Sequence, residues 1–358
     1  MTSTALLPTL HIGNLQISPP IIQGAMGVRV SRGGLAAAVA NEGCAGMIAS
    51  VGLGDYEHSS ANTFVAVNND ALRAEIRKAR ALAPTGVIGV NVMVVLSNFA
   101  ELVTVCVEEN VDLIVCGSGL PLDLPKYLNG KDIKLVPIVS SVRALSLICR
   151  KWKQNYDRLP DAVIVEGPEA GGHLGYSFDD LTRNEAPTLE QLVTELVAFT
   201  KTLDRPLPVI AAGGIFDGKD IAKFLKLGAS GVQMATRFVC TDECDVDQRF
   251  KQAYIDAKEE DTVIINSPVG LPGRVIKSTF VTRVQKGDTV PFLCRHHCLR
   301  TCDPNTVPYC IAKVLGDASR GEFEDAFVFA GSNAYRCTEI VPVKKLVGQL
   351  SAELLANI

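Results

Sequence analysis

No stretch of about 18 consecutive apolar residues occurs in this chain of 358 residues, although a membrane-spanning helix needs a run of about that length. The first residues, Met1 to Pro8, lack the basic region and apolar core of a secretory signal. The net charge of −4 and the absence of like-charge runs exclude a basic surface for nucleic acid. We therefore expect a cytoplasmic protein without a nucleic-acid or membrane partner.

The chain does contain short, continuous apolar segments, each followed by a glycine or small polar residue. Helical spacing then follows each segment, so strand and helix alternate. Continuous apolar strands are typical of a parallel sheet covered by helices on both faces. Eight such units match a (β/α)8 TIM barrel of about 250 residues better than an open doubly wound sheet. The predicted strands are Pro20–Gln23, Ala45–Ser50, Val87–Val92, Asp112–Cys116, Leu135–Val139, Ala162–Glu166, Pro208–Ala212 and Gly231–Ala235.

The alternation of predicted strands and helices ends after the eighth strand. We predict that residues 1–240 form the barrel, 241–308 a smaller lid with a cysteine-rich segment, and 309–358 a return to the barrel. In the lid, Cys244–Asp261 is predicted as one charged helix. The barrel helices are predicted at Gly34–Asn41, Asp70–Ala83, Phe99–Asn110, Val142–Trp152, Leu189–Leu203 and Lys219–Leu227, and later helical spacing occurs at Val307–Gly316 and Val343–Leu355.

Two loops at the carboxyl ends of strands seven and eight are suited to a phosphate group. Gly213 and Gly214 follow strand seven, and Asp217-Gly218 then opens a helix whose first N–H groups can face an anion. Ala235 and Thr236 follow strand eight, next to Arg237. Barrels of this class commonly hold phosphate between these loops. The alternative is that the glycines only make tight turns.

The first and third strands end in residues that suit a flat ring. Gly24, Ala25 and Met26 let backbone approach it, and the Asn91 amide can both donate and accept hydrogen bonds. A flavin, which is flat and edged with donors and acceptors, needs this combination. Met26 as a core residue and Asn91 as a cap are the alternatives.

His173 lies in a glycine-rich loop after the sixth strand, in the sequence Glu-Ala-Gly-Gly-His-Leu-Gly. Gly171 and Gly172 remove side-chain bulk, and a histidine exchanges protons near neutral pH. We predict that His173 is catalytic. Glu166 and Glu169 either orient its imidazole, bind a ribityl hydroxyl of the cofactor, or are surface acids.

These motifs resemble the nitronate monooxygenase (2-nitropropane dioxygenase-like) family of FMN-dependent barrels, to which the flavin-dependent enoyl-acyl carrier protein reductases are closely similar. The resemblance implies that Gly213, Gly214, Ala235 and Thr236 bind the FMN phosphate, that Gly24, Ala25, Met26 and Asn91 lie near the flavin ring, and that His173 faces the substrate. We also predict that Glu166, Gly171 and Gly172 belong to the cofactor site. It is carried by Pro20–Gly27, Gly89–Asn91, Glu166–Gly175, Pro208–Ile215 and Gly228–Phe238, and Ala330–Ala334 is similar to the family's returning loop at the flavin edge.

The resemblance implies oxidation of alkyl nitronates with O2. One departure is that the fifth strand ends in Ser140-Ser141, where some family members carry a lysine, which is more like the reductase branch. The alternative is therefore an NAD(P)H-dependent enoyl (acyl carrier protein) or related C=C reductase acting on an enoyl thioester. It would bind NAD(P)H transiently over the flavin, since the chain has no separate dinucleotide fingerprint. A third hypothesis is a flavin-free phosphate-binding lyase or isomerase. The oligomeric state stays open, with a homodimer as one option.

Eleven cysteines are many for a chain without a secretory signal and indicate thiols or metal ligands rather than disulfides. Cys294, Cys298, Cys302 and Cys310 lie close together, with His296 and His297 among them. Their spacing predicts a [4Fe-4S] cluster, or a zinc ion if a histidine replaces one thiolate. The alternative is that the first three, four residues apart, line one buried helix face as small apolar side chains.

Overall fold

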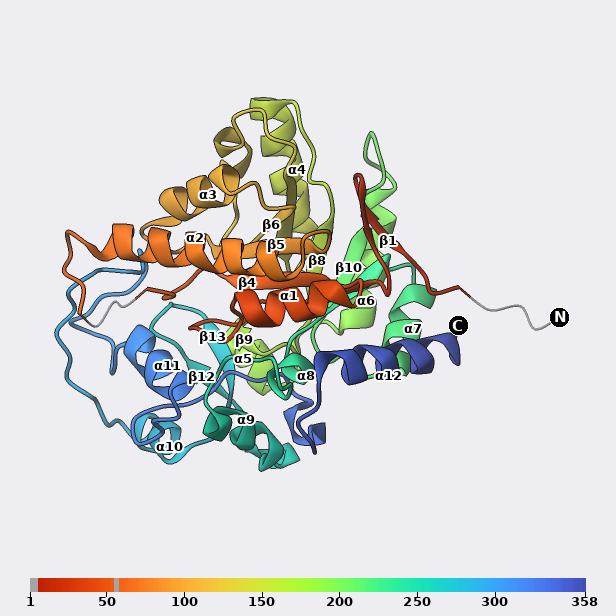
Figure 1. Ribbon diagram of the computed structural model, residues 1–358. Coiled ribbons are helices and arrows are strands. Elements are labelled where there is room, and N and C mark those ends of the chain that lie inside the picture. Colours follow the sequence, from red (N-terminus) through yellow and green to blue (C-terminus); the bar gives the residue numbers. More distant parts are fainter. Residues whose placement is uncertain (1–5, 55–57) are drawn as a thin grey trace.

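The computed structural model describes residues 6–54 and 58–358. The prediction that Met1 to Pro8 are not a secretory signal falls partly on residues 1–5, which lie outside the described residues. Eight parallel strands close into a barrel surrounded by helices (Figure 1). The predicted TIM barrel is confirmed, and each of the eight predicted segments overlaps one barrel strand. The strands are β3 (Ile21–Gln23), β4 (Ala45–Ala49), β5 (Val87–Met93), β6 (Leu113–Gly117), β7 (Lys134–Val139), β8 (Val163–Glu166), β10 (Val209–Ala212) and β11 (Gly231–Met234).

Alternate side chains of each strand point to opposite faces, which explains why the strands are apolar throughout. One set fills the barrel interior, for example Met47, Leu113 and Ile210. The other set packs outward against the helices. A short hairpin of β1 (Leu10–Ile12) and β2 (Leu15–Ile17) adds buried side chains to the interior set, and the apolar pattern of the barrel strands gave no sign of it.

The predicted barrel helices are present with shifts of up to six residues at their ends, and two short helices, Phe178–Thr182 and Thr236–Val239, were not predicted. Within the described residues, no helix is long and apolar enough to cross a membrane. Helix α12 packs against α7 and α1, so the end of the chain returns to the barrel (Figure 1). The helices are α1 (Gly33–Asn41), α2 (Phe64–Leu82), α3 (Phe99–Glu108), α4 (Val142–Tyr156), α5 (Phe178–Thr182), α6 (Leu189–Thr200), α7 (Gly218–Lys226), α8 (Thr236–Val239) and α12 (Val343–Leu355).

The prediction of one helix over Cys244–Asp261 is wrong. Helix α9 covers only Gln248–Ile255, and a 3-10 turn follows at Glu259–Asp261. The side chain of Asp247 accepts a hydrogen bond from the Arg249 N–H and caps the helix, because a short acidic side chain competes with helix continuation at this position.

The segment after α9 forms a small sheet that covers the carboxyl ends of the barrel strands. Strands β12 (Thr262–Asn266) and β13 (Pro272–Ile276) pair antiparallel, and β13 also pairs with β9 (Gly172–His173). Helices α9, α10 (Thr279–Gln285) and α11 (Ile311–Ser319) lie beside this sheet in the lower left of Figure 1. Because β9 directly follows barrel strand β8, the small sheet is joined to the predicted catalytic loop.

Candidate active site

A cavity of about 730 Å³ lies between the carboxyl ends of the barrel strands and the segment that covers them. This volume is in the upper part of the range of about 300–1,000 Å³ that is usual for ligand sites. Among the predicted site residues, those that line it are Gly24, Ala25, Met26, Asn91, Glu166, Gly171, Gly172, His173, Ala235 and Thr236. Gly213 and Gly214 lie next to it, against the Ala170 backbone and the Glu169 side chain.

His173 is held from two sides in the cavity wall. Its backbone pairs with Gly273 of β13, and its Nε2 lies 2.8 Å from the Ser267 hydroxyl. The Phe329 ring packs edge-on against the imidazole, with 4.8 Å between ring centroids. Desolvation lowers the pKa of His173 to about 4. The imidazole is therefore neutral at pH 7, so it can accept a proton or form hydrogen bonds but brings no positive charge.

Glu166 ends strand β8 and lines the same cavity. Desolvation raises its pKa to about 8. The Tyr176 hydroxyl donates a 2.6 Å hydrogen bond to the backbone oxygen of Glu166 and not to its carboxylate. At pH 7 the carboxyl group is therefore mostly protonated and can donate a hydrogen bond to a ligand.

We expect Glu166→Gln to change the pH dependence of stability. A carboxyl group whose folded-state pKa is raised binds more protons folded than unfolded, so it lowers stability as pH rises from about 4.5 to 8. The glutamine variant lacks this loss, and its free energy of unfolding relative to wild type should increase by on the order of a few kcal/mol between pH 5 and pH 8.5. Urea unfolding of the ligand-free proteins measures this, with the exposed Glu195→Gln as control. A difference between Glu166→Gln and wild type that stays constant with pH would contradict the assignment.

The amino end of α7 is not open to an anion, contrary to the prediction from Asp217-Gly218. The Asp217 carboxylate accepts hydrogen bonds from the N–H groups of Lys219 and Asp220, both 3.0 Å long. The Gly218 N–H donates to Glu353 Oε2 of α12 at 2.8 Å. Carboxylates of the chain thus occupy the helix end, and a phosphate there would meet negative charge.

The loops of Gly213-Gly214 and Ala235-Thr236 remain candidates for the predicted phosphate site. Gly213 and Gly214 have φ angles of +99° and +75°, which favour glycine and turn the chain sharply after β10. Within the described residues, the N–H groups of Gly214 and Thr236 donate to no acceptor of the chain. These two loops, and not the end of α7, therefore remain the candidates for the predicted phosphate site.

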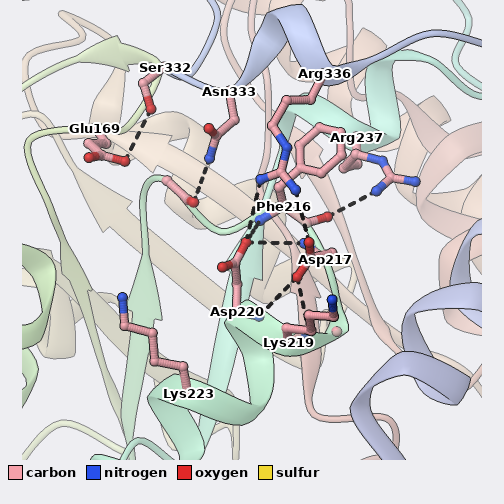
Figure 2. A network of polar contacts seen from close by, with 12 residues as sticks. Glu169, Phe216, Asp217, Lys219, Asp220, Lys223, Arg237, Ser332, Asn333 and Arg336 are labelled. Atoms are coloured by element: carbon pink, nitrogen blue, oxygen red, sulfur yellow. Dashed lines mark hydrogen bonds and ion pairs between the residues drawn. The ribbon is translucent and has the colours of Figure 1, made fainter. Parts of the chain in front are cut away.

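The predicted returning loop, Ala330–Ala334, does lie over these two loops (Figure 2). The Gly331 N–H donates to Thr236 Oγ1 at 3.1 Å, and the Asn333 amide donates to the Gly214 carbonyl at 2.6 Å. Ser332 bonds to Glu169 through both its N–H and its hydroxyl. Of the three roles left open for Glu169, the structure supports the surface acid, because its side chain is exposed, and its carboxylate also holds the returning loop through Ser332.

An arginine pair fixes the end of this loop. The Arg336 guanidinium donates to the Asp217 carboxylate at 2.9 Å and lies 4.1 Å from the centroid of the Phe216 ring. The Arg237 guanidinium lies 4.3 Å from the same centroid and donates to the Phe216 carbonyl (Figure 2). Arg237 therefore supports the loop through Phe216.

Sequence reasoning missed several residues of the site. Ser50, just after β4, is buried and lines the cavity, and its hydroxyl has no hydrogen-bond partner within the described residues. Gln23 is fully buried and bonds to Ser31 and to the Met47 N–H, which ties the first two barrel strands together. Ser267 and Phe329 contact His173 from distant parts of the chain. A polar residue inside or directly after an apolar strand was the available signal for Ser50 and Gln23, whereas nothing in the sequence marks Ser267 and Phe329.

The four late cysteines lie together at one side of the cavity, and Cys294, Cys298 and Cys310 line it. They are not on one buried helix face, because the segment from residue 289 to 310 contains no helix. Within residues 6–54 and 58–358, no three histidine, cysteine or acidic side chains converge closely enough to hold a metal ion. Neither the predicted [4Fe-4S] cluster nor the zinc alternative is therefore supported.

Known proteins and solved structures are similar to this chain over most of its length. Residues 9–353 match the family model described as nitronate monooxygenase. A probable nitronate monooxygenase of Staphylococcus saprophyticus is 32% identical over 192 residues, 53% of this chain and 51% of that protein. A (3aS,4S,5R,7aS)-5-hydroxy-7a-methyl-1-oxo-octahydro-1H-indene-4-carboxyl-CoA dehydrogenase of Mycobacterium tuberculosis is 29% identical over 76% of this chain and 66% of that protein. This chain thus spans between about half and two thirds of these relatives. The structure of FabK from Thermotoga maritima is similar with a TM-score of 0.71 and 30% identity, covering 94% of this chain and 92% of that chain.

Proposed function

This chain belongs to the nitronate monooxygenase family, and from this membership we propose that it is an FMN-dependent oxidoreductase that oxidises alkyl nitronates with O2. The observation that carries the proposal is the position of His173. It lies in the wall of the barrel-end cavity, together with the small residues of the first and eighth strands. A flat cofactor on those residues and a substrate beside the histidine would share one cavity.

The cavity fits the polar edge and the flat face of a flavin. The Ser50 hydroxyl is buried without a partner among the described residues, and a buried polar group normally has one, so a bound ligand would satisfy it. Gly172 has a φ of +81°, and a side chain there would meet nothing within 4 Å, so backbone is open to the cavity at this point. Asn91 and the largely protonated Glu166 add hydrogen-bond donors.

Bound FMN would accept electrons from the substrate and pass them to oxygen. The chain itself supplies position and protons. Ser267 and Phe329 hold the imidazole of His173, which is neutral and therefore available as a base or as a hydrogen-bond donor to the nitronate oxygens. Protein on both sides encloses the site, which strengthens these hydrogen bonds relative to water.

The cavity beyond His173 suits an apolar substituent on the substrate. Apolar side chains line part of the cavity, beside charged ones such as Lys313, Asp317 and Arg320, and this apolar part would accommodate an alkyl chain. The apolar side chains of this wall include Phe64, Met93, Leu96, Leu102, Val269, Leu299 and Phe329.

The proposal is tested by chromophore and by oxygen uptake. We expect the purified protein to be yellow, to release about one FMN per chain on denaturation, and to consume O2 when propionate 3-nitronate or an alkyl nitronate is added. Oxidation of NADH or NADPH that depends on an enoyl thioester, without oxygen uptake on nitronates, would replace the proposal with the reductase alternative. Protein that releases no FMN would contradict both.

A further inference from the structure

The turn of residues 167–171 joins barrel strand β8 to His173 in β9, and no helix or strand covers it. Gly171 and Gly172 stand directly before His173, and Gly172 has a φ of +81°. Glycine restricts backbone rotation less than any other residue. The turn by itself therefore does not fix the direction in which the imidazole points, and contacts from other segments have to do so.

Three successive carbonyl oxygens of this turn accept hydrogen bonds from distant parts of the chain. The Arg274 guanidinium donates from Nη2 to the Pro168 oxygen at 2.9 Å and from Nε to the Ala170 oxygen at 3.2 Å. Between them, the Glu169 oxygen accepts from the Ser332 N–H at 3.1 Å. Arg274 thus satisfies the carbonyl of Ala170, a buried residue whose oxygen would otherwise lack a partner within the described residues.

The backbone of Arg274 holds the same region from strand β13. Arg274 is in register with Gly172, and its neighbour Gly273 is in register with His173. The Arg274 carbonyl also accepts a hydrogen bond from the Ala330 N–H of the returning loop at 3.2 Å. A Cβ on Gly171 would come within 2.5 Å of the Ala330 backbone, so the returning loop packs directly on the turn. The catalytic loop, the small sheet and the returning loop therefore meet at Arg274.

The guanidinium of Arg274 is used on backbone carbonyls and not on a carboxylate, because within the described residues it makes no ion pair. Burial lowers its pKa, and the charge of Glu169 opposes this effect. A guanidinium is a rigid fork that can serve two acceptors at once, which an ammonium group does less well. Arg274 does not line the cavity, so it contacts no ligand there.

We propose that Arg274 is a positioning residue that holds His173 in its buried place in the active-site cavity. The proposal rests on the proposed function, in which His173 acts on the nitronate. Without the two hydrogen bonds to Pro168 and Ala170, the glycines before His173 would let the imidazole shift. A misplacement of a reacting group by about 1 Å can lower a rate by about 100-fold.

The protonation of His173 reports its position, because burial alone lowers its pKa to about 4. The side chains that contact it within the described residues, Ser267 and Phe329, are uncharged. The titratable groups on the elements around it are Glu166 on β8, Glu169 in the turn, Tyr254 on α9 and Arg274 on β13. An imidazole released toward water therefore regains a pKa near its ordinary value of about 6.5.

The test compares Arg274→Met, which keeps an apolar stem, with Arg274→Lys, which keeps the charge. We expect kcat of Arg274→Met on an alkyl nitronate to fall about 100-fold, with a smaller change in KM, and Arg274→Lys to be intermediate. Histidine NMR titration, with His173 assigned by its absence in His173→Ala, should show its pKa rising from about 4 toward 6.5 in Arg274→Met. Arg150→Met, at an exposed position on α4, is the control and should match wild type in both measurements.

Circular dichroism checks the fold of each variant, and Arg274→Lys replaces Arg274→Met if the latter does not fold. A merely structural role would lower the unfolding midpoint and leave the pKa of His173 in the folded protein unchanged. A pKa that stays near 4 in the folded variants, or a kcat within about threefold of wild type, would overturn the proposal. Wild-type protein that oxidises no nitronate would count against the proposed function, whereas the NMR titration would still decide whether Arg274 holds His173.

Discussion

Replacing His173 by alanine is expected to lower kcat on an alkyl nitronate by about 10²- to 10⁴-fold, which is the usual contribution of a positioned acid or base. Within the described residues, the hydrogen bonds and ring contacts of His173 join it to Ser267, Gly273 and Phe329 and not to the predicted phosphate loops, so the FMN content of the variant should equal that of wild type. Steady-state oxygen uptake, together with FMN released on denaturation, measures both. His11→Ala in the exposed part of β1 is the matched control and should keep full turnover.

The pH profile separates a chemical role of His173 from a structural one. Its pKa of about 4 means that the imidazole stays neutral as pH falls from 8 to about 5 and becomes charged only below that. If the neutral form is required, kcat/KM of wild type should be constant over this range and decline near pH 4, not near the ordinary value of about 6.5. Full turnover in a His173→Ala variant that retains FMN would refute the assignment.

The largest effect on cofactor binding is expected from Gly24→Val. A Cβ at Gly24 would lie 3.1 Å from Ala235 Cβ and 3.3 Å from Gln233 Cγ, so the ends of β3 and β11 already meet without a side chain. Valine places two more methyl groups there, at the edge of the cavity where the flavin ring is expected. We expect FMN affinity to fall about 100-fold, which corresponds to roughly 2.7 kcal/mol, as measured by fluorescence titration of the FMN-free protein.

Gly348→Ala is the matched control for this substitution. It lies on α12, where an added Cβ would meet nothing within 4 Å, and alanine is a better helix former than glycine. We expect its FMN affinity to be unchanged and its stability to be equal or slightly higher. FMN affinity of Gly24→Val within threefold of wild type, with a normal unfolding midpoint, would show that the flavin does not approach this strand end.

The barrel could be predicted because its strands are apolar along their whole length. A strand such as Val163–Glu166 is buried on both faces, and that requirement is visible in consecutive residues. The glycines and small residues at the strand ends were equally visible, since close approach of backbone limits which residues fit. The positions of Gly24, Ala25 and Gly172 at the site could therefore be predicted from their local sequence, and all three line the cavity.

Other features depend on residues far apart in the sequence. The amino end of α7 matched an anion site by its local pattern, but Glu353, from the last helix, occupies it. A hydrogen bond between residues 135 positions apart leaves no periodicity that a sequence pattern could show.

The sequence by itself determined the barrel, the position of the glycine-rich loop and the grouping of the late cysteines, because each follows from neighbouring residues and from the spacing of strands. Only the tertiary structure decided how that loop works. Pairing of β9 with β13 brings Ser267 to His173, and the return of Phe329 desolvates the imidazole. Burial sets the protonation states of His173 and Glu166, and this burial arises only when distant segments pack together.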